Sequence, residues 1–187
     1  MKTIGFAFCG SFCTFRKTVD SLKLLSESYE IVPIFSPASC TTDSRFGTAE
    51  AWRQEVTEIC GREPLCTISE VEPIGPKKLL DLLVIAPCTG NTLGKLANGI
   101  ADSSVTLACK AHLRNARPVV LGISTNDGLA ASAENIGKLL NRKHYYFVPF
   151  GQDSPHGKPC SLVAEMSLLP QTVAEALEGR QLQPILL

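Results

Sequence analysis

The feature that most constrains the fold of this chain is an apolar run followed by a polar turn and a helical pattern. The run, residues 82–86 (Leu-Leu-Val-Ile-Ala), is typical of a buried strand. Pro87 has no backbone N–H to donate, so we expect strand pairing to stop there. Residues 89–92 (Thr-Gly-Asn-Thr) then offer small polar groups before a helix. This order predicts a ligand pocket at the carboxyl edge of a parallel sheet; an ordinary loop capped by an asparagine is the alternative.

Strand-like and helix-like segments alternate along the whole chain. We expect strands at residues 3–9, 31–35, 65–68, 82–86, 118–123 and 145–148. We expect helices at residues 14–27, 48–60, 93–114 with a break near residue 98, 130–141 and 169–177, and a loop at residues 151–161. The alternation predicts one α/β domain, residues 1–187, with a three-layer, Rossmann-like (flavodoxin-like) parallel sheet and helices on both faces.

The composition narrows the classes of function. The 18 basic and 18 acidic residues balance, which argues against a nucleic-acid-binding surface. No apolar run is long enough to span a bilayer, and residues 1–8 lack the pattern of a signal peptide, so we expect a cytoplasmic protein. The eight cysteines include no Cys-x-x-Cys pair and no zinc-type spacing. We therefore expect no metal site and no disulfide, with most cysteines packed as small apolar residues.

Four polar turns are expected to meet at one edge of the sheet. They are residues 10–11, 36–39, 89–92 and 124–127, and each follows a predicted strand. The carboxyl ends of parallel strands share an edge, where ligands of open α/β folds bind. Hydroxyls, amides and glycines suit a phosphate held by O–H and N–H donors. The chain has neither the Gly-x-Gly-x-x-Gly pattern nor a Walker lysine motif. We therefore expect a mononucleotide, with FMN as the leading candidate.

The same segments resemble a known family. Residues 87–92 (Pro-Cys-Thr-Gly-Asn-Thr) and 97–102 (Ala-Asn-Gly-Ile-Ala-Asp) resemble two motifs of the homo-oligomeric flavin-containing cysteine decarboxylases. Residues 10–16 and 35–39 are similar to that family's first and second turns. Relatives of these decarboxylases include phosphopantothenoylcysteine decarboxylase and the flavin prenyltransferases. The resemblance implies bound FMN, a trimer-based homo-oligomer and, within residues 149–168, an active-site flap.

Two departures from the family pattern bear on the reaction. The decarboxylases place an active-site histidine before the central strand, whereas no histidine lies between Met1 and Lys110 here. Residues 124–127 (Ser-Thr-Asn-Asp) also stand where the family has Pro-x-Met-Asn. Decarboxylation of a peptidyl or pantothenoyl cysteine is therefore not expected.

The second half of the chain resembles one branch of the family from spore-forming bacteria. The similar segments are residues 123–129, 135–141, 147–155 and 158–164. This resemblance implies an oxidoreductase of sporulation, in the mother-cell cytoplasm, that works with a companion subunit of different sequence. Together they would oxidise a dihydropyridine dicarboxylate to pyridine-2,6-dicarboxylate, with NADP as the usual acceptor. Two arrangements are open: this chain holds a flavin that receives the hydride, or its pocket holds the nicotinamide cofactor or the substrate while the companion supplies a Rossmann site. The alternatives are a flavin-dependent decarboxylase or prenyltransferase, and a non-catalytic cofactor-binding protein that stabilises the companion.

Candidate site residues follow from the turns and the resemblance. Asn91 and Asp127 are predicted to be catalytic, Asn91 by holding the substrate or cofactor and Asp127 by taking a proton; a helix cap and a turn are the alternative roles. The product's two carboxylates require cations, sought among Arg16, Lys95 and Lys158, each of which is otherwise a surface charge. The predicted cofactor contacts are Gly10, Ser11, Phe12, Ser36, Ser39, Thr89, Gly90, Thr92, Ser124 and Thr125. Cys160 lies in the flap region and is interpreted as structural.

Overall fold

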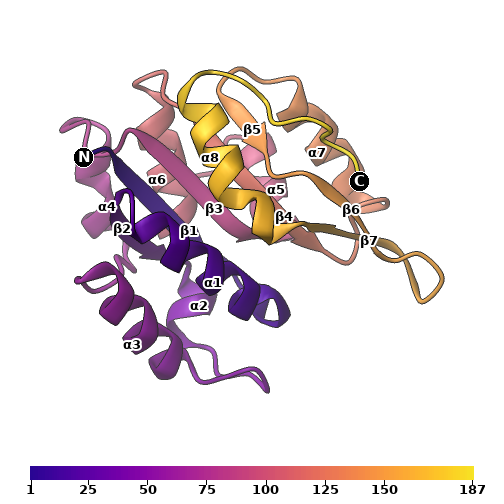
Figure 1. Cartoon of the computed structure of the whole chain (residues 1–187), viewed down its shortest axis with the longest axis horizontal. Helices are drawn as coiled ribbons and strands as arrows, with labels where there is room; N and C mark the ends of the chain where they lie inside the picture. Colours follow the sequence, from indigo (N-terminus) through magenta and orange to yellow (C-terminus); the bar gives the residue numbers. More distant parts are fainter.

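Seven strands form one sheet, and five of them run parallel. The computed structural model describes residues 1–187. The sheet has the order β2-β1-β3-β4, and the two halves of β4 have different outer neighbours: β5 is parallel to the first half, and β7 is antiparallel to the second. The parallel order β2-β1-β3-β4-β5 is that of flavodoxin-like folds. The predicted single-domain α/β class is therefore confirmed (Figure 1).

The centre of the sheet is buried on both faces. The strands are β1 (Thr3–Phe8), β2 (Glu30–Phe35), β3 (Leu82–Cys88), β4 (Val119–Thr125), β5 (Tyr145–Phe147), β6 (Phe150–Ser154) and β7 (Lys158–Ala164). All seven residues of β3 are buried, as expected for an apolar parallel strand covered by helices. One continuous apolar core joins β1, β3 and β4 to the helices around them. This core fixes where each strand ends, and so where the polar turns begin.

Helices cover both faces of the sheet. They are α1 (Phe15–Ser26), α2 (Pro37–Thr41), α3 (Ala49–Cys60), α4 (Ile68–Val71), α5 (Gly90–Ala97), α6 (Ser104–Leu113), α7 (Ala131–Leu140) and α8 (Leu169–Leu177), with short 3-10 turns η1 (Phe12–Thr14), η2 (Glu72–Ile74) and η3 (Met166–Leu168). Figure 1 shows α1 and α8 in front of the sheet, with α5 and α6 behind it. The predicted break near residue 98 is confirmed. None of the helices combines the length and apolar character that a membrane span requires.

Strand β3 does not stop at Pro87, which corrects the prediction from the sequence. The strand continues to Cys88, whose partner on β4 is Ile123. The register with β4 shifts between Ile85 and Cys88. Because Pro87 has no N–H to donate, the ladder is interrupted there, but it resumes one residue later. Helix α5 begins at Gly90, with Thr89 as its N-cap, three residues earlier than expected.

Two further segments differ from the expected secondary structure. Residues 65–68 are not a strand: Leu65 makes a single bridge with Ile34, and a capping box formed by Thr67 and Glu70 then starts α4. Residues 151–161 are not a loop, because β6 and β7 pair there as an antiparallel hairpin. Figure 1 shows this hairpin reaching out from the body of the molecule.

The chain contains a disulfide, which corrects the expectation that all cysteines are free. Cys40, in α2, is bonded to Cys66, and their Cα atoms are 6.4 Å apart. The pair could not be identified from spacing, because 26 residues separate the two positions. The bond ties the turn after β2 to the segment that precedes α4. The other six cysteines are free, as expected, and three of them (Cys9, Cys88 and Cys109) are buried.

Candidate functional site

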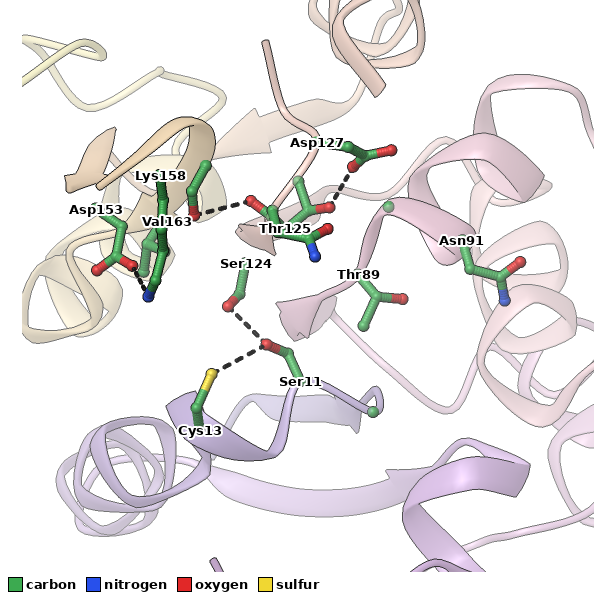
Figure 2. A pocket seen from close by; sticks show the side chains of 14 residues that line it. Ser11, Cys13, Thr89, Asn91, Ser124, Thr125, Asp127, Asp153, Lys158 and Val163 are labelled. Atoms are coloured by element: carbon green, nitrogen blue, oxygen red, sulfur yellow. Dashed lines mark hydrogen bonds and ion pairs between the residues drawn. The ribbon is translucent and has the colours of Figure 1, made fainter. Parts of the chain in front are cut away.

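Two adjoining hollows open at the carboxyl edge of the sheet. The larger, which we call the main cleft, has a volume of about 700 Å³, and the smaller, the side hollow, about 430 Å³. The main cleft is lined by Gly10, Ser11, Cys13, Thr89, Gly90, Asn91, Ser124, Thr125, Asn126, Asp127, Asp153, Lys158, Ser161 and Val163 (Figure 2). The side hollow is lined by Cys9, Gly10, Ser36, Pro37, Ala38, Thr89, Asn91, Thr92, Lys95, Asp102 and Ser103. All four polar turns therefore converge here. The edge includes the switch point between β1 and β3, where the strand order reverses its direction.

A hydroxyl network joins the turn after β1 to the end of β4. The Ser11 and Ser124 hydroxyl oxygens are 2.8 Å apart, and the Thr14 and Ser124 hydroxyl oxygens are 2.7 Å apart. Thr14 and Ser124 are buried, whereas Ser11 is only half-buried. Figure 2 shows Ser11 and Ser124 facing each other across the floor of the main cleft. The network fixes two of the converging turns relative to each other.

The N-terminus of α5 points into both hollows. Thr89 caps the helix, since its hydroxyl accepts from the Thr92 amide at 3.3 Å and donates to the Thr92 hydroxyl at 3.1 Å. The amides of Gly90 and Asn91 precede Thr92, and first-turn amides have no acceptor within their own helix. Thr92 is mostly buried, and its hydroxyl donates to the Cys9 sulfur at 3.3 Å. The helix start therefore offers N–H donors to an anion, while Thr92 mainly supports the turn.

Gly90 is required by the close approach of α5 to the turn after β4. A Cβ atom at this position would lie 2.7 Å from the hydroxyl oxygens of Ser132 and Thr125, and 2.8 Å from Oδ1 of Asp127. Real Cβ atoms do not come so close to neighbouring atoms. Gly90 therefore allows the N-terminus of α5 to approach the C-terminal end of β4 at the cleft. This role is separate from its predicted contact with a cofactor.

Asp127 holds the turn after β4 together. Its Oδ1 accepts hydrogen bonds from the Thr125 hydroxyl and, at 2.8 Å, from the Ser132 hydroxyl. These donors, Thr125 first, hold the pKa of the Asp127 carboxyl below its usual range. Asp127 lines the main cleft as predicted, but the lowered pKa makes it a weak base. Asp127 therefore stabilises the turn, which is the alternative role given above beside proton transfer.

Each hollow contains one lysine, and each lysine is paired with an aspartate from the same lining. In the main cleft, Nζ of Lys158 is 2.8 Å from Oδ2 of Asp153. In the side hollow, Nζ of Lys95 is 2.8 Å from Oδ1 and 3.0 Å from Oδ2 of Asp102. The pairing raises the pKa of Lys158 and lowers that of Asp102. Two of the three predicted cations thus line the site, and both carry a counter-ion that sequence analysis did not identify.

Arg16, predicted as a substrate-binding cation, does not line either hollow. Its guanidinium forms a bidentate pair with Glu55, with N···O distances of 2.6 Å and 2.9 Å, and lies 4.7 Å from the centre of the Trp52 ring. The pairing arises because α3 packs against α1. Arg16 therefore stabilises a helix–helix contact away from the site.

Two predicted cofactor contacts, Ser39 and Phe12, are not among the lining residues. Ser39 is buried, and its hydroxyl donates to the Phe8 carbonyl at 3.1 Å and lies 3.0 Å from the Ser36 hydroxyl. Phe12 packs on Phe15, with ring centres 5.2 Å apart. Both side chains instead contact other residues of the fold and so stabilise the turns in which they lie. Ser36 lines the side hollow and stays a candidate cofactor contact.

Several lining residues were not identified from the sequence. They are Cys9, Cys13, Pro37, Ala38, Asp102, Ser103, Asn126, Asp153, Ser161 and Val163. Ser161 and Val163 reach the cleft because β7 pairs with the end of β4, and alternation along β7 predicts which residues share that face once the hairpin is known. Cys160 does not line either hollow. Burial raises the pKa of the Cys9 thiol to about 11, so this thiol is neutral near pH 7.

The lining fits a phosphorylated mononucleotide. Ser11, Thr89 and Thr125 present hydroxyls to the main cleft, Ser36 presents one to the side hollow, and the start of α5 adds backbone amides. The first-turn amides of α5 are free to donate to phosphate oxygens. The Thr89 and Thr125 hydroxyls already donate to Thr92 and Asp127, so they offer acceptor oxygens to ribityl hydroxyls. The hollows share part of their lining, and their volumes lie within the range of about 300–1,000 Å³ that is common for small-molecule sites. The donors and the volumes therefore fit a flavin nucleotide.

The comparisons with known proteins agree with this geometry. Residues 1–155 match the family described as Flavoprotein. The chain is 47% identical over 186 residues to the B subunit of dipicolinate synthase from Bacillus subtilis (strain 168), and the match covers 99% of this chain and 93% of that protein. The crystal structure of the dipicolinate synthase B subunit from Bacillus halodurans superposes with a TM-score of 0.91 at 43% identity, covering 100% of this chain and 96% of that one.

A more distant structure shows the same fold. The FMN-dependent cysteine decarboxylase SpaF superposes with a TM-score of 0.68 at 22% identity, and the alignment covers 94% of this chain and 97% of that one. At such low identity the likeness concerns the fold alone.

Proposed function

Because this chain belongs to the flavoprotein family, we propose that it is the B subunit of a dipicolinate synthase. In this proposal it acts with its companion, the A subunit of the same enzyme, to oxidise dihydrodipicolinate to dipicolinate (pyridine-2,6-dicarboxylate). The observation that carries the proposal is the 47% identity to the Bacillus subtilis protein over 99% of this chain. The polar cleft at the sheet edge supports it, because the cleft has a lysine for a carboxylate and donors for a phosphorylated cofactor.

In this proposal FMN lies against the turns after β1, β3 and β4. The first amides of α5 would donate to its phosphate, and the hydroxyl oxygens of Ser11, Thr89 and Thr125 would accept from its ribityl hydroxyls. Ser36 would add a further hydroxyl oxygen in the side hollow. When bound, FMN accepts a hydride, and NADP would then be the final acceptor, on this chain or on its companion. The buried bonds of Ser124 keep the donors fixed before the cofactor arrives, so little ordering is needed on binding.

The remaining lining residues would bind the substrate. Oxidation of dihydrodipicolinate removes a hydride and a proton, and the gain of aromaticity favours the reaction, so orientation is the main task of the protein. The Asn91 amide and the Lys158 ammonium lie on opposite sides of the main cleft, where each would hold one carboxylate (Figure 2). Asp127 remains the candidate proton acceptor from sequence analysis, although its lowered pKa favours a positioning role. The β6–β7 hairpin lies within residues 149–168 and would serve as the expected active-site flap.

Assembly and location complete the proposal. We expect a trimer-based homo-oligomer that binds the companion subunit, in the mother-cell cytoplasm of a spore-forming bacterium. Light scattering of the purified chain tests the first part, since a monomer would contradict it. Co-purification with the companion tests the second.

The test of function is dipicolinate formation by the reconstituted pair of subunits. The complex should oxidise dihydrodipicolinate with NADP, and omission of this chain should abolish the reaction. Asn91→Ala should lower the rate at least tenfold while leaving assembly with the companion intact, because only substrate or cofactor positioning is lost. Asn141→Ala, at the exposed C-terminal end of α7, is the matched control and should leave the rate unchanged. Full activity of Asn91→Ala, with assembly still dependent on this chain, would instead support a non-catalytic role.

A further inference from the structure

Lys158 is the one cation that lines the main cleft. It stands at the start of β7, while Asp153 is on β6, so the two strands of one hairpin supply both members of the pair. Nζ of Lys158 is 2.8 Å from Oδ2 of Asp153. The Lys158 side chain is 63% exposed and that of Asp153 39% exposed. Figure 2 shows the pair on the hairpin side of the cleft, opposite Asn91.

The charge of the lining is unfavourable for a dicarboxylate while this pair is closed. The lining has two carboxylates, Asp127 and Asp153, against the single ammonium of Lys158. Asp127 is occupied within its own turn by Thr125 and Ser132. A dianion entering the cleft would therefore meet a lysine that is already neutralised and an aspartate that repels it.

The Lys158–Asp153 pair is suited to open. Exposed ion pairs of this kind contribute little to stability, because water screens them and the side chains lose freedom in forming them. The two side chains are hydrogen-bonded only to each other. Opening the pair therefore exposes both charged groups to solvent and breaks no buried hydrogen bond. A ligand carboxylate can thus replace the Asp153 carboxylate at the Lys158 ammonium at small cost.

We propose that Asp153 is an internal substitute for a substrate carboxylate, and that Lys158 exchanges it for one carboxylate of an incoming dicarboxylate. Asp153 is held close to Lys158 by the hairpin, so its local concentration is high and a ligand with a single weak contact does not displace it. A dicarboxylate does displace it, because its second carboxylate gains a separate contact on the Asn91 side of the cleft. The pair therefore selects for ligands with two carboxylates. The inference rests on the proposed function only for the identity of the dicarboxylate.

The test is isothermal titration of the full-length chain with pyridine-2,6-dicarboxylate at one fixed ionic strength. Asp153→Asn should lower the dissociation constant about three- to tenfold, because the competing carboxylate is gone. Lys158→Gln should raise it at least tenfold. The double variant should bind no better than Lys158→Gln, since the gain from Asp153→Asn depends on the lysine. Glu175→Gln, which frees Arg180 from a similar exposed pair on α8, is the control and should change nothing.

Two outcomes would overturn the exchange. If Asp153→Asn weakens binding as Lys158→Gln does, Asp153 positions the lysine and does not compete for it. If neither variant changes the dissociation constant, the hairpin takes no part in binding. Glutarate, a flexible dicarboxylate, separates the exchange from the proposed function: if glutarate binds and responds to the variants while pyridine-2,6-dicarboxylate does not bind, the exchange is supported and the substrate assignment is wrong. Absence of binding by both ligands overturns the exchange.

Discussion

The two walls of the main cleft are built in different ways. One wall consists of the turns after β1, β3 and β4, where Ser124 is buried and hydrogen-bonded to Ser11 and Thr14. The other wall is the β6–β7 hairpin, which reaches out from the sheet and presents the exposed Lys158–Asp153 pair. The first wall is fixed by the core of the fold. The hairpin is anchored at its base by the pairs between β7 and the end of β4 and by the core residues Phe150, Leu162 and Ala164, whereas its tip, with Asp153 and Lys158, is mostly exposed.

This difference suggests a division of tasks. A cofactor that stays bound benefits from donors that are already in place, because binding then costs little ordering. A substrate that must enter and leave benefits from contacts that form and break readily at an exposed surface. We therefore assign the cofactor to the turn wall, and the dicarboxylate to the hairpin wall with Asn91 as its one contact on the opposite side. The following predictions first perturb the turn after β2, which lies beside the turn wall, and then the turn wall itself at three points, from the largest expected effect to the smallest.

The largest effect should come from the disulfide that anchors the turn after β2. Opening the Cys40–Cys66 bond frees a segment of 26 residues, for which loop entropy gives a loss of about 3 kcal/mol in the free energy of unfolding. The loss should appear in urea denaturation with and without reductant, and in the Cys40→Ser/Cys66→Ser variant. The variant itself should show no response to reductant. If reductant destabilises the variant as much as the wild type, the effect does not come from this bond.

Gly90→Ala should have the next largest effect. The new methyl group would meet Ser132, Thr125 and Asp127 at 2.7–2.8 Å, and overpacking of this kind costs about 1–3 kcal/mol. Because either α5 must move or the hydrogen bonds of Asp127 with Thr125 and Ser132 must break, FMN binding should weaken by more than tenfold. Gly137→Ala in α7 is the matched control: nothing lies within 4 Å of a Cβ there, so this change should be neutral or stabilising. Equal effects of the two substitutions would contradict the close approach at Gly90.

Ser124→Ala should have a smaller effect, because it removes one hydroxyl without adding bulk. Thr14 would lose a buried hydrogen bond and Ser11 a half-buried one, at a cost of about 1–2 kcal/mol in urea denaturation. FMN binding should weaken several-fold as Ser11 becomes free to rotate. Ser28→Ala, an exposed serine at the end of α1, provides the comparison and should be silent in both measurements. A fully stable Ser124→Ala protein would show that the network does not hold the wall together.

Asp127→Asn should have the smallest effect and a characteristic pH dependence. The folded-state pKa of Asp127 is lowered by the Thr125 and Ser132 hydroxyls. A lowered carboxyl pKa contributes stability above its unfolded value, about 3.9, and that contribution is lost as the pH falls through the folded value. The difference in free energy of unfolding between wild type and variant should therefore be constant near pH 7 and shrink below about pH 4. A difference that grows in acid would contradict the assigned sign.

Much of the turn wall could be predicted from the sequence, because its position follows from local patterns. Each turn comes directly after an apolar run, and parallel strands place their carboxyl ends on one edge. Gly10, Ser11, Thr89 and Asn91 were identified in this way, and all four line the site. The direction of a side chain within a turn was harder to predict. Ser39 lies in the expected turn but points into the core, because its hydroxyl satisfies the Phe8 carbonyl.

The hairpin wall could be predicted only in part, because its contacts join residues through tertiary structure. Lys158 was identified as a candidate cation, but its partner Asp153 requires knowledge that β6 and β7 pair. The Lys95–Asp102 pair depends similarly on the turn between α5 and α6. Arg16 follows the first turn closely in the sequence, but its guanidinium pairs with Glu55 of α3 outside the two hollows. The disulfide likewise joins two cysteines that no spacing rule connects.

The visible absorption spectrum of the purified chain, with the released cofactor identified by mass, tests the central claim most directly. The claim is that the turn wall holds FMN and the hairpin does not. It predicts flavin absorption bands with FMN released from the wild type, a reduced flavin content in Ser124→Ala, and an unchanged content in Lys158→Gln. A colourless wild-type protein that binds NADP or pyridine-2,6-dicarboxylate in this cleft, but no FMN, would contradict it.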